Sequence, residues 1–389
     1  MPATPTQSAL LSSVPTQLLI GGSWRDAADG GTFAVEDPAT GRTLAHVADA
    51  TVADGTAALD AAVAAQPAWA ATAPRERGEI LRLAYERLVE RTEAFALAMT
   101  LEMGKPLAES RGEVAYGSEF FRWFGEEAVR VHGQWSVSPD GKTRLMTMRQ
   151  PVGPVLMITP WNFPLAMGTR KIGPAIAAGC TMVVKPAGQT PLTMLLLAEL
   201  LTECGLPDGV LNVVTTSHTG EVCEPIIRDP RLRKLTFTGS TEVGRRLVEQ
   251  SAEQLLRVSM ELGGNAPFLV FEDADVDRAV EGAMLAKMRN IGEACTAANR
   301  FYVHTSVAEE FSTKFAAKMG ALTLGKGTKK GVTVGPLIDD KARQKVTELL
   351  DDALTRGAVV LTGGRPQKGA GYFFEPTVIT DVPTSARLQ

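Results

Sequence analysis

Residues 152–187, VGPVLMITPWNFPLAMGTRKIGPAIAAGCTMVVKPA, decide the fold class of this chain. The two ends of the stretch, VGPVLMITP and CTMVVKPA, are apolar runs of strand length, and RKIGPAIAAG between them is long enough for a helix. Apolar strands that alternate with helices predict a parallel sheet covered on both faces. Ligands of such sheets bind beyond the carboxyl ends of the strands.

The same alternation continues along the chain, and a second α/β unit begins after Arg257. We therefore predict an α/β fold with two doubly wound parallel domains. A hairpin signal around Pro-Asp-Gly interrupts two larger helical or α/β regions, and the N-terminal arm is rich in proline and has no positively charged side chain. The predicted organisation is a disordered arm (1–17), a nucleotide-binding domain (18–131 and 151–258), a projecting hairpin (132–150) and a catalytic domain (259–389).

The composition is that of a globular protein, with 44% hydrophobic residues, 22% charged residues and a net charge of −4. This small charge predicts no nucleic-acid or anionic-membrane partner, and no apolar run is long enough for a membrane span. The four cysteines form no C-x-x-C pair and the four histidines are scattered, so we expect no metal site and no disulfide framework. A reducing cytoplasm suits such a chain.

Polar and glycine residues follow three of the predicted strands. In TPWNFP, two prolines fix a loop that holds the amide of Asn162, which suits an oxyanion site or, alternatively, caps a structural turn. Lys185 ends an apolar strand, where it can donate to ribose hydroxyls or reach out to solvent. In TFTGSTEVGRRL, Gly239 and Gly244 lie between a strand and a helix, as a phosphate site or as an ordinary turn with Ser240 as N-cap.

Two further residues carry reactive side chains. Glu261 lies in an apolar strand before two glycines, where burial would raise its pKa and suit a general base. The alternative is a surface glutamate on an edge strand. Cys295 lies among small residues in NIGEACTAANR, and it is either a buried small hydrophobe or a nucleophile.

Taken in order, TPWNFP, KPA, FTGSTEVG, ELGGN and GEACTAANR resemble the motifs of the NAD(P)-dependent aldehyde dehydrogenase superfamily, at similar separations over about residues 18–388. The resemblance implies an aldehyde dehydrogenase-like fold, with the hairpin as the oligomerisation arm of a homodimer or homotetramer. It also implies a small-molecule aldehyde as substrate and NADP or NAD as cofactor. Family members continue past the C-terminal end of this chain, so the resemblance predicts an incomplete catalytic domain.

The family's roles carry over to the matching positions. Cys295 would attack the aldehyde, Asn162 and the backbone N–H of Cys295 would stabilise the oxyanion, and Glu261 would activate water against the thioester. A thiol suits this chemistry because a thiohemiacetal can release hydride and the resulting thioester remains hydrolysable. The residues implied at the cofactor are Trp161, Lys185, Gly188, Gly239, Ser240, Gly244 and Leu262.

Four positions bear on substrate, cofactor and regulation. Arg170 and Arg289 stand where the succinate-semialdehyde dehydrogenase branch holds the far carboxylate of its substrate, and the alternative is that both are surface arginines. Many members of that branch carry a second cysteine two residues after the nucleophile, but this chain has Ala297, so no redox switch is expected. Where NAD-preferring members often have a glutamate, this chain has Gly188, which predicts that NADP is tolerated and slightly preferred.

The predicted function is oxidation of succinate semialdehyde to succinate with NAD(P)+. One alternative is a dehydrogenase of broad aldehyde range. Another is a catalytically inactive chain that binds only nucleotide or a partner.

Overall fold

The computed structural model describes residues 5–388, which form two compact units. Unit 1 comprises the chain up to Val35 together with Ala45–Ala96 and Arg111–Glu261. Unit 2 comprises Glu36–Leu44, Leu97–Ser110 and the chain from Leu262 onward. We assigned residues 36–44 and 97–110 to the nucleotide-binding domain, but they belong to unit 2. The start of the catalytic domain falls three residues later than predicted, at Leu262. Both differences arise because contacts between residues far apart in the chain define the units.

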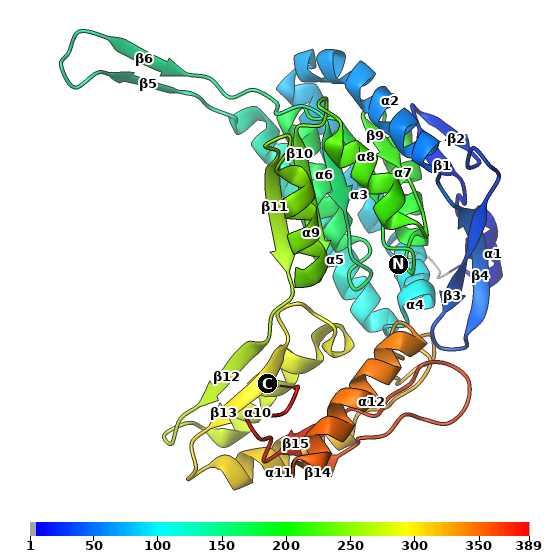
Figure 1. Ribbon diagram of the computed structural model, residues 1–389, viewed down its shortest axis with the longest axis vertical. Helices are drawn as coiled ribbons and strands as arrows, with labels where there is room; N and C mark the ends of the chain where they lie inside the picture. The colour runs from blue at the N-terminus through cyan, green and yellow to red at the C-terminus, as the bar shows by residue number, and fades with distance from the viewer. Residues whose placement is uncertain (1–4, 389) are drawn as a thin grey trace. The chain divides into compact units, whose positions relative to one another are not determined.

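The central sheet of unit 1 contains the apolar strands predicted at the two ends of residues 152–187, as β7 (Val155–Ile158) and β8 (Met182–Lys185). Its order is β11 (Arg257–Leu262), β10 (Lys234–Gly239), β7, β8, β9 (Leu211–Val213), β1 (Leu18–Ile20) and β2 (Ser23–Arg25). Strands β10, β7, β8 and β9 are parallel, and β1 pairs antiparallel with β9 and β2. Every residue of β7 and β8 is buried, because helices cover both faces of the sheet (Figure 1).

Helices of unit 1 pack in two groups. Helix α2 (Val52–Ala71) contacts α8 (Thr219–Arg228), which contacts α9 (Thr241–Ser251), whereas α3 (Pro74–Glu90) contacts α6 (Ala166–Ala178) and α7 (Leu192–Glu203). The C-cap of helix α6 is Gly179, whose φ of 78° is left-handed and suits glycine. Of the remaining elements before β7, η1 (Ala128–Arg130) lies in unit 1. Each of four others spans a boundary between the units: α4 (Thr92–Met103), α5 (Leu107–Glu127), β3 (Thr32–Asp37) and β4 (Arg42–Ala48).

The disorder predicted for residues 1–17 is wrong for the segment that forms α1 (Gln7–Ser13). Thr6 caps this helix, since its hydroxyl accepts the N–H of Ala9 at 3.2 Å, and Leu10 is buried. The helix is therefore fixed by a cap and an apolar anchor. Residues 1–4 of the predicted arm lie outside the described residues.

The predicted hairpin is present as β5 (Gln134–Val137) and β6 (Arg144–Thr147), with Gln134 opposite Thr147 in an antiparallel pair (Figure 1). Every residue of both strands is exposed. The exposed side chains include Trp135 and Met146, which are large and apolar.

Unit 2 is built around a parallel strand pair. Strand β12 (Ala266–Val270) pairs in parallel with β13 (Ala298–Val303), and α10 (Val276–Met288) connects them. The other elements are η2 (Arg289–Gly292), α11 (Ala308–Gly320), α12 (Asp340–Thr355), β14 (Val359–Thr362) and β15 (Val378–Thr380). We predicted a doubly wound parallel sheet for this part of the chain, but within residues 262–388 the parallel pairing is limited to β12 and β13. The other strand pair, β14 and β15, is antiparallel.

The core of unit 2 is apolar and aromatic. Phe311 and Phe315 of α11 pack against Val280 of α10 and Val270 of β12. The ring centroids of Phe311 and Phe315 lie 5.7 Å apart. This cluster fixes α10 against α11 and so supports the segment that leads into the cysteine motif.

Candidate active site

The carboxyl ends of the parallel strands bring several predicted site residues to one edge of the unit 1 sheet. Ile158 of β7 is paired with Lys185 of β8 and with Phe237 of β10. The loop that contains Asn162 follows β7, and Gly239 ends β10. Parallel strands end on the same side of a sheet, so these segments are neighbours.

The loop of Asn162 is held at both sides. The hydroxyl of Thr190 donates to the carbonyl of Trp161 at 3.4 Å. A carboxylate oxygen of Glu113, a buried residue of α5, accepts two backbone N–H groups at residues 165–166, each at 2.9 Å. Because these N–H groups lie at the start of α6, the glutamate fixes the end of the loop. Asn162 is half-buried on this fixed loop, as an oxyanion donor requires.

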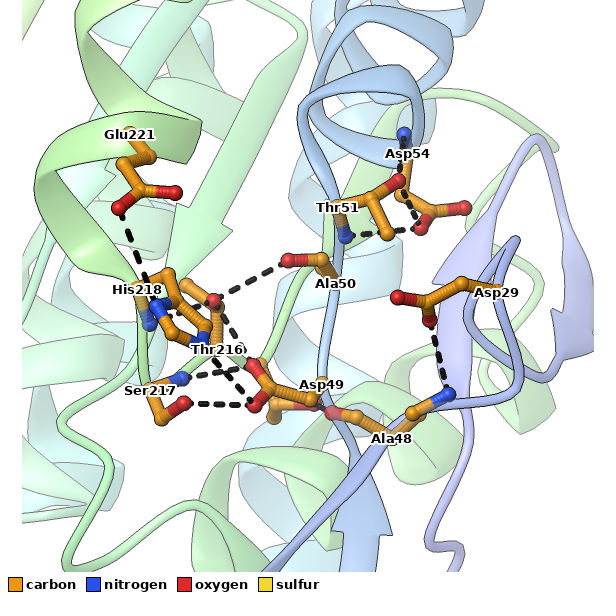
Figure 2. Close-up of polar contacts among 12 residues, drawn as sticks. Asp29, Ala48, Asp49, Ala50, Thr51, Asp54, Thr216, Ser217, His218 and Glu221 are labelled. Atoms are coloured by element: carbon orange, nitrogen blue, oxygen red, sulfur yellow. Dashed lines mark hydrogen bonds and ion pairs between the residues drawn. The ribbon is translucent and has the colours of Figure 1, made fainter.

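Lys185 is buried, so the alternative in which it reaches out to solvent is wrong. Burial lowers the pKa of Lys185, although the Cys223 thiol and the Asp49 carboxylate oppose that effect. Figure 2 shows Asp49 accepting the backbone N–H of Ser217 at 2.8 Å and its hydroxyl at 2.6 Å. Burial opposes ionisation of Asp49, but these hydrogen bonds outweigh it and lower the pKa of the carboxyl. An ionised carboxylate therefore ties the loop after β9 close to the lysine.

The predicted phosphate segment lies between strand β10 and helix α9. An added Cβ at Gly239 would collide with the ring of Phe237, so a larger residue there would have to displace that ring. Ser240 is the N-cap of α9, and its hydroxyl accepts an N–H of the first turn. Gly244 is buried on that helix. At Gly188 an added Cβ would meet nothing closer than 3.8 Å, so this position is open and bears no carboxylate.

Glu261 is exposed, and the predicted burial of its carboxyl is wrong. It lies in β11, an edge strand of the sheet, and most residues of that strand are exposed. The adjacent Leu262 is half-buried and belongs to unit 2. The charge of Glu261 acts on Lys171 of α6: burial lowers the pKa of Lys171 to about 8, and Glu261 opposes this shift.

Lys171 is a residue that sequence reasoning missed. Its ammonium group donates to the hydroxyl of Thr236 at 2.8 Å, and the residue is buried. The signal available in the sequence was a charged residue inside the apolar helical run RKIGPAIAAG. That signal does not distinguish a buried lysine from a surface one, because the pairing with Thr236 spans 65 residues.

The two predicted substrate arginines lie in different units. Arg170 is on α6, with its guanidinium carbon 5.4 Å from the ring centroid of Phe120. Arg289 is exposed after α10 in unit 2. The same division separates Asn162 from Cys295. The structure therefore places Asn162, Lys185 and Gly239 in unit 1, and Leu262 and the cysteine motif in unit 2.

All four cysteines are described, and Cys295 alone is exposed. Burial raises the pKa of Cys223 to about 11 and also raises that of Cys204. A thiol must be accessible to act as a nucleophile. The alternative in which Cys295 is a buried small hydrophobe is therefore wrong.

The carboxyl of Glu293, two residues before the cysteine, is a further feature that sequence reasoning missed. Burial raises its pKa to about 8, although Lys105 and Lys287 oppose this. A glutamate between glycine and alanine in a polar loop gives no sign of burial. Among residues 5–388, no cluster of side chains is arranged to hold a metal ion, and no helix has the length and apolar character of a membrane span.

A model of the aldehyde dehydrogenase family matches residues 24–389, and the chain belongs to that family. The succinate-semialdehyde dehydrogenase of Paenarthrobacter nicotinovorans is 60% identical over 345 residues, which are 89% of this chain and 77% of that relative. The glutarate-semialdehyde dehydrogenase of Pseudomonas aeruginosa is 49% identical over 95% of this chain and 76% of its own length. The crystal structure of an NADP-dependent enzyme of E. coli superposes with a TM-score of 0.95 at 49% identity, covering 98% of this chain and 78% of that one. The predicted family, α/β fold class and enzyme class are confirmed.

Proposed function

We propose that this chain oxidises succinate semialdehyde to succinate with NADP+ or NAD+, and that Cys295 is the nucleophile. The exposure of Cys295, in a chain whose other three cysteines are buried, carries this proposal. The similarity to a succinate-semialdehyde dehydrogenase supports the substrate. Glutarate semialdehyde, which is one methylene longer, is the second candidate because a relative named for it is 49% identical.

In the proposed reaction, the thiolate of Cys295 attacks the carbonyl carbon of the aldehyde and forms a thiohemiacetal. The amide of Asn162 and the backbone N–H of Cys295 donate to its oxyanion. Once hydride has left that carbon, a thioester remains on Cys295. Glu261 takes a proton from water, the water oxygen attacks the thioester, and the carboxylate product leaves with the thiolate regenerated.

The edge of the unit 1 sheet fits a nicotinamide dinucleotide. It combines the buried Lys185 with Gly239, which has no side chain, and with the start of α9. In this proposal Lys185 holds ribose hydroxyls, and Gly239 and Ser240 lie against the pyrophosphate. The nicotinamide supplies a two-electron hydride acceptor when it is bound. The other residues proposed at the cofactor are Trp161, Gly188, Gly244 and Leu262.

The open position at Gly188 supports a preference for NADP, because no carboxylate there repels a 2′-phosphate. Gly188→Glu should raise the KM for NADP at least about tenfold, since like charges in contact cost more than a kcal/mol. The KM for NAD should stay level or fall. An unchanged ratio of the two KM values would show that this position does not select the cofactor.

Arg170 and Arg289 are proposed to hold the far carboxylate of the substrate. The test compares kcat/KM for succinate semialdehyde, glutarate semialdehyde and butanal, which has no carboxylate. Either arginine-to-alanine variant should lower kcat/KM for succinate semialdehyde about 10- to 100-fold, the loss of one charged hydrogen bond, and leave that for butanal nearly unchanged. Arg278→Ala, on the exposed face of α10, is the matched control.

The control for the chemistry is Cys295→Ser, which should abolish formation of reduced cofactor. If the arginine variants leave the substrate ratio unchanged, the chain is a dehydrogenase of broad aldehyde range. If the folded wild-type chain forms no reduced cofactor, the alternative that it binds only nucleotide or a partner is favoured.

We also propose that the β5–β6 hairpin is the oligomerisation arm of a homodimer or homotetramer. Trp135 is 67% exposed and Met146 is 66% exposed, and an exposed apolar strand pair is a template for association. Trp135→Asp should shift sedimentation velocity profiles towards a smaller species. A cytoplasmic location is proposed because all four cysteines are unpaired thiols.

A further inference from the structure

The segment that carries Cys295 begins with an unusual backbone turn. We call residues 289–297, between α10 and β13, the nucleophile loop. Asn290 and Ile291 both have φ of 54°, and Gly292 has φ of 85°, so three consecutive residues are left-handed. Glycine adopts this conformation freely and asparagine tolerates it, but a β-branched isoleucine is an outlier there. Such a turn persists only when its surroundings hold it.

Two side chains from a distant segment hold the first residue of this turn. The ammonium group of Lys105 donates to the side-chain oxygen of Asn290 at 2.6 Å. A carboxylate oxygen of Glu109 accepts the backbone N–H of Asn290 at 3.0 Å. Asn290 is 1% exposed and Lys105 is 0% exposed, so solvent does not compete for the side-chain contact. The backbone and the side chain of Asn290 are thus each held by a separate group.

The segment that supplies these groups is fixed within unit 2. The backbone N–H of Leu107 donates to the carbonyl of Gly327 at 3.1 Å. An added Cβ at Gly327 would collide with the carbonyl of Lys105, so the two backbones are in close contact. On the far side of the turn, the ammonium group of Lys287 donates to the carbonyl of Gly292 at 3.4 Å. A lysine set in such rigid surroundings can impose a position on the loop.

We propose that Lys105 and Glu109 are positioning residues for the nucleophile: they hold Asn290 in its left-handed conformation and thereby fix the place at which the loop presents Cys295. This inference rests on the proposed role of Cys295 in the reaction. Both residues act through Asn290, without contact with the substrate. The contacts join segments that are 185 and 181 residues apart.

The first test measures the loop and the reaction in Asn290→Ala and Lys105→Met. Hydrogen exchange of peptides within residues 289–299 should become at least tenfold faster in both variants, while exchange in α12 stays unchanged. The kcat for succinate semialdehyde should fall at least tenfold, and the KM for NADP should stay within twofold. Lys341→Met, the same substitution at an exposed site on α12, should behave as wild type in both measurements. Wild-type exchange and wild-type kcat in the two folded variants would overturn the proposal.

The second test uses conservative variants, which keep the proposal testable if the first two variants do not fold. Asn290→Asp keeps the acceptor for Lys105 and the tolerance for a left-handed backbone, and Glu109→Gln keeps the acceptor for the backbone N–H. Both should retain kcat within threefold of wild type, whereas Asn290→Gly, which suits the backbone but lacks the acceptor, should resemble Asn290→Ala. A wild-type kcat for Asn290→Gly, or a tenfold loss in Asn290→Asp, would refute the role of the Lys105 contact.

These readouts separate this inference from the proposed function. Hydrogen exchange reports on the loop whether or not Cys295 is the nucleophile. Activity that survives in Cys295→Ser would refute the proposed function and leave the exchange result standing. Loss of activity in Cys295→Ser, with wild-type exchange in Asn290→Ala, would refute the positioning role alone.

Discussion

Glu293 should make the free energy of unfolding depend on pH in a range where most glutamates do not titrate. Burial raises the pKa of its carboxyl from 4.5 to about 8, so the folded state favours the neutral acid. The stability that this preference contributes is fully present below pH 4.5 and is lost as the pH rises through 8. At pH 7, about 2.5 pH units above the ordinary pKa, the unfolded chain ionises Glu293 and the folded chain largely does not, which lowers the free energy of unfolding by about 3 kcal/mol. By pH 9 this loss reaches about 5 kcal/mol.

Glu293→Gln removes this titration and preserves the shape of the side chain. The variant should gain less than about 1 kcal/mol over wild type at pH 5, about 3 kcal/mol at pH 7 and about 5 kcal/mol at pH 9. Urea unfolding followed by far-UV circular dichroism at the three pH values measures these differences. Glu348→Gln, on the exposed face of α12, is the matched control, because water hydrates that carboxylate in both states. A difference between Glu293→Gln and wild type that stays constant from pH 5 to pH 9 would refute the assignment of a buried neutral acid.

Three further predictions concern stability. Burial lowers the pKa of Lys171 from 10.5 to about 8, so the folded state pays for holding this ammonium group at neutral pH. In the same urea assay, Lys171→Met should therefore raise the free energy of unfolding by about 3 kcal/mol at pH 7, and this gain should shrink as the pH rises towards 10.5. Thr51→Ala removes the side-chain cap of α2, seen in Figure 2, and should cost about 1 kcal/mol in the unfolding free energy, whereas Thr51→Ser should keep most of it. Phe315→Ala leaves a cavity in the unit 2 core and should cost about 3–5 kcal/mol; a loss below 1 kcal/mol would show that the core collapses into the space.

The elements from β7 to α9 could be predicted from the sequence in their order and type. Each of these strands is a short apolar run and each helix is a longer segment between turn residues, and both signals depend only on neighbouring residues. The order of the motifs likewise placed Asn162, Lys185 and Gly239 at strand ends, and the parallel register of the sheet brings those ends together.

Burial could not be predicted in the same way. Glu261 lies in a strand whose pattern suggested an interior position, but β11 is at the edge of the sheet and leaves its carboxyl exposed. The sequence analysis did not single out Glu293, and its carboxyl is buried beside Lys105. Local composition left two alternatives open for Glu261 and gave no sign of burial for Glu293, because the strand order and a distant segment determine the surroundings of these carboxyl groups.

The sequence alone determined the family, the order of strands and helices in the nucleotide-binding unit and the identity of the cysteine that we propose as nucleophile, because these depend on local periodicity and on motif order. Only the tertiary structure decided that Cys295 is exposed, that residues 97–110 belong to the unit of the cysteine, and that Lys105 and Glu109 hold the turn before it. The physical reason is that burial, pKa and the support of a left-handed turn arise from contacts between segments far apart in the chain, and no local pattern in either segment encodes its partner.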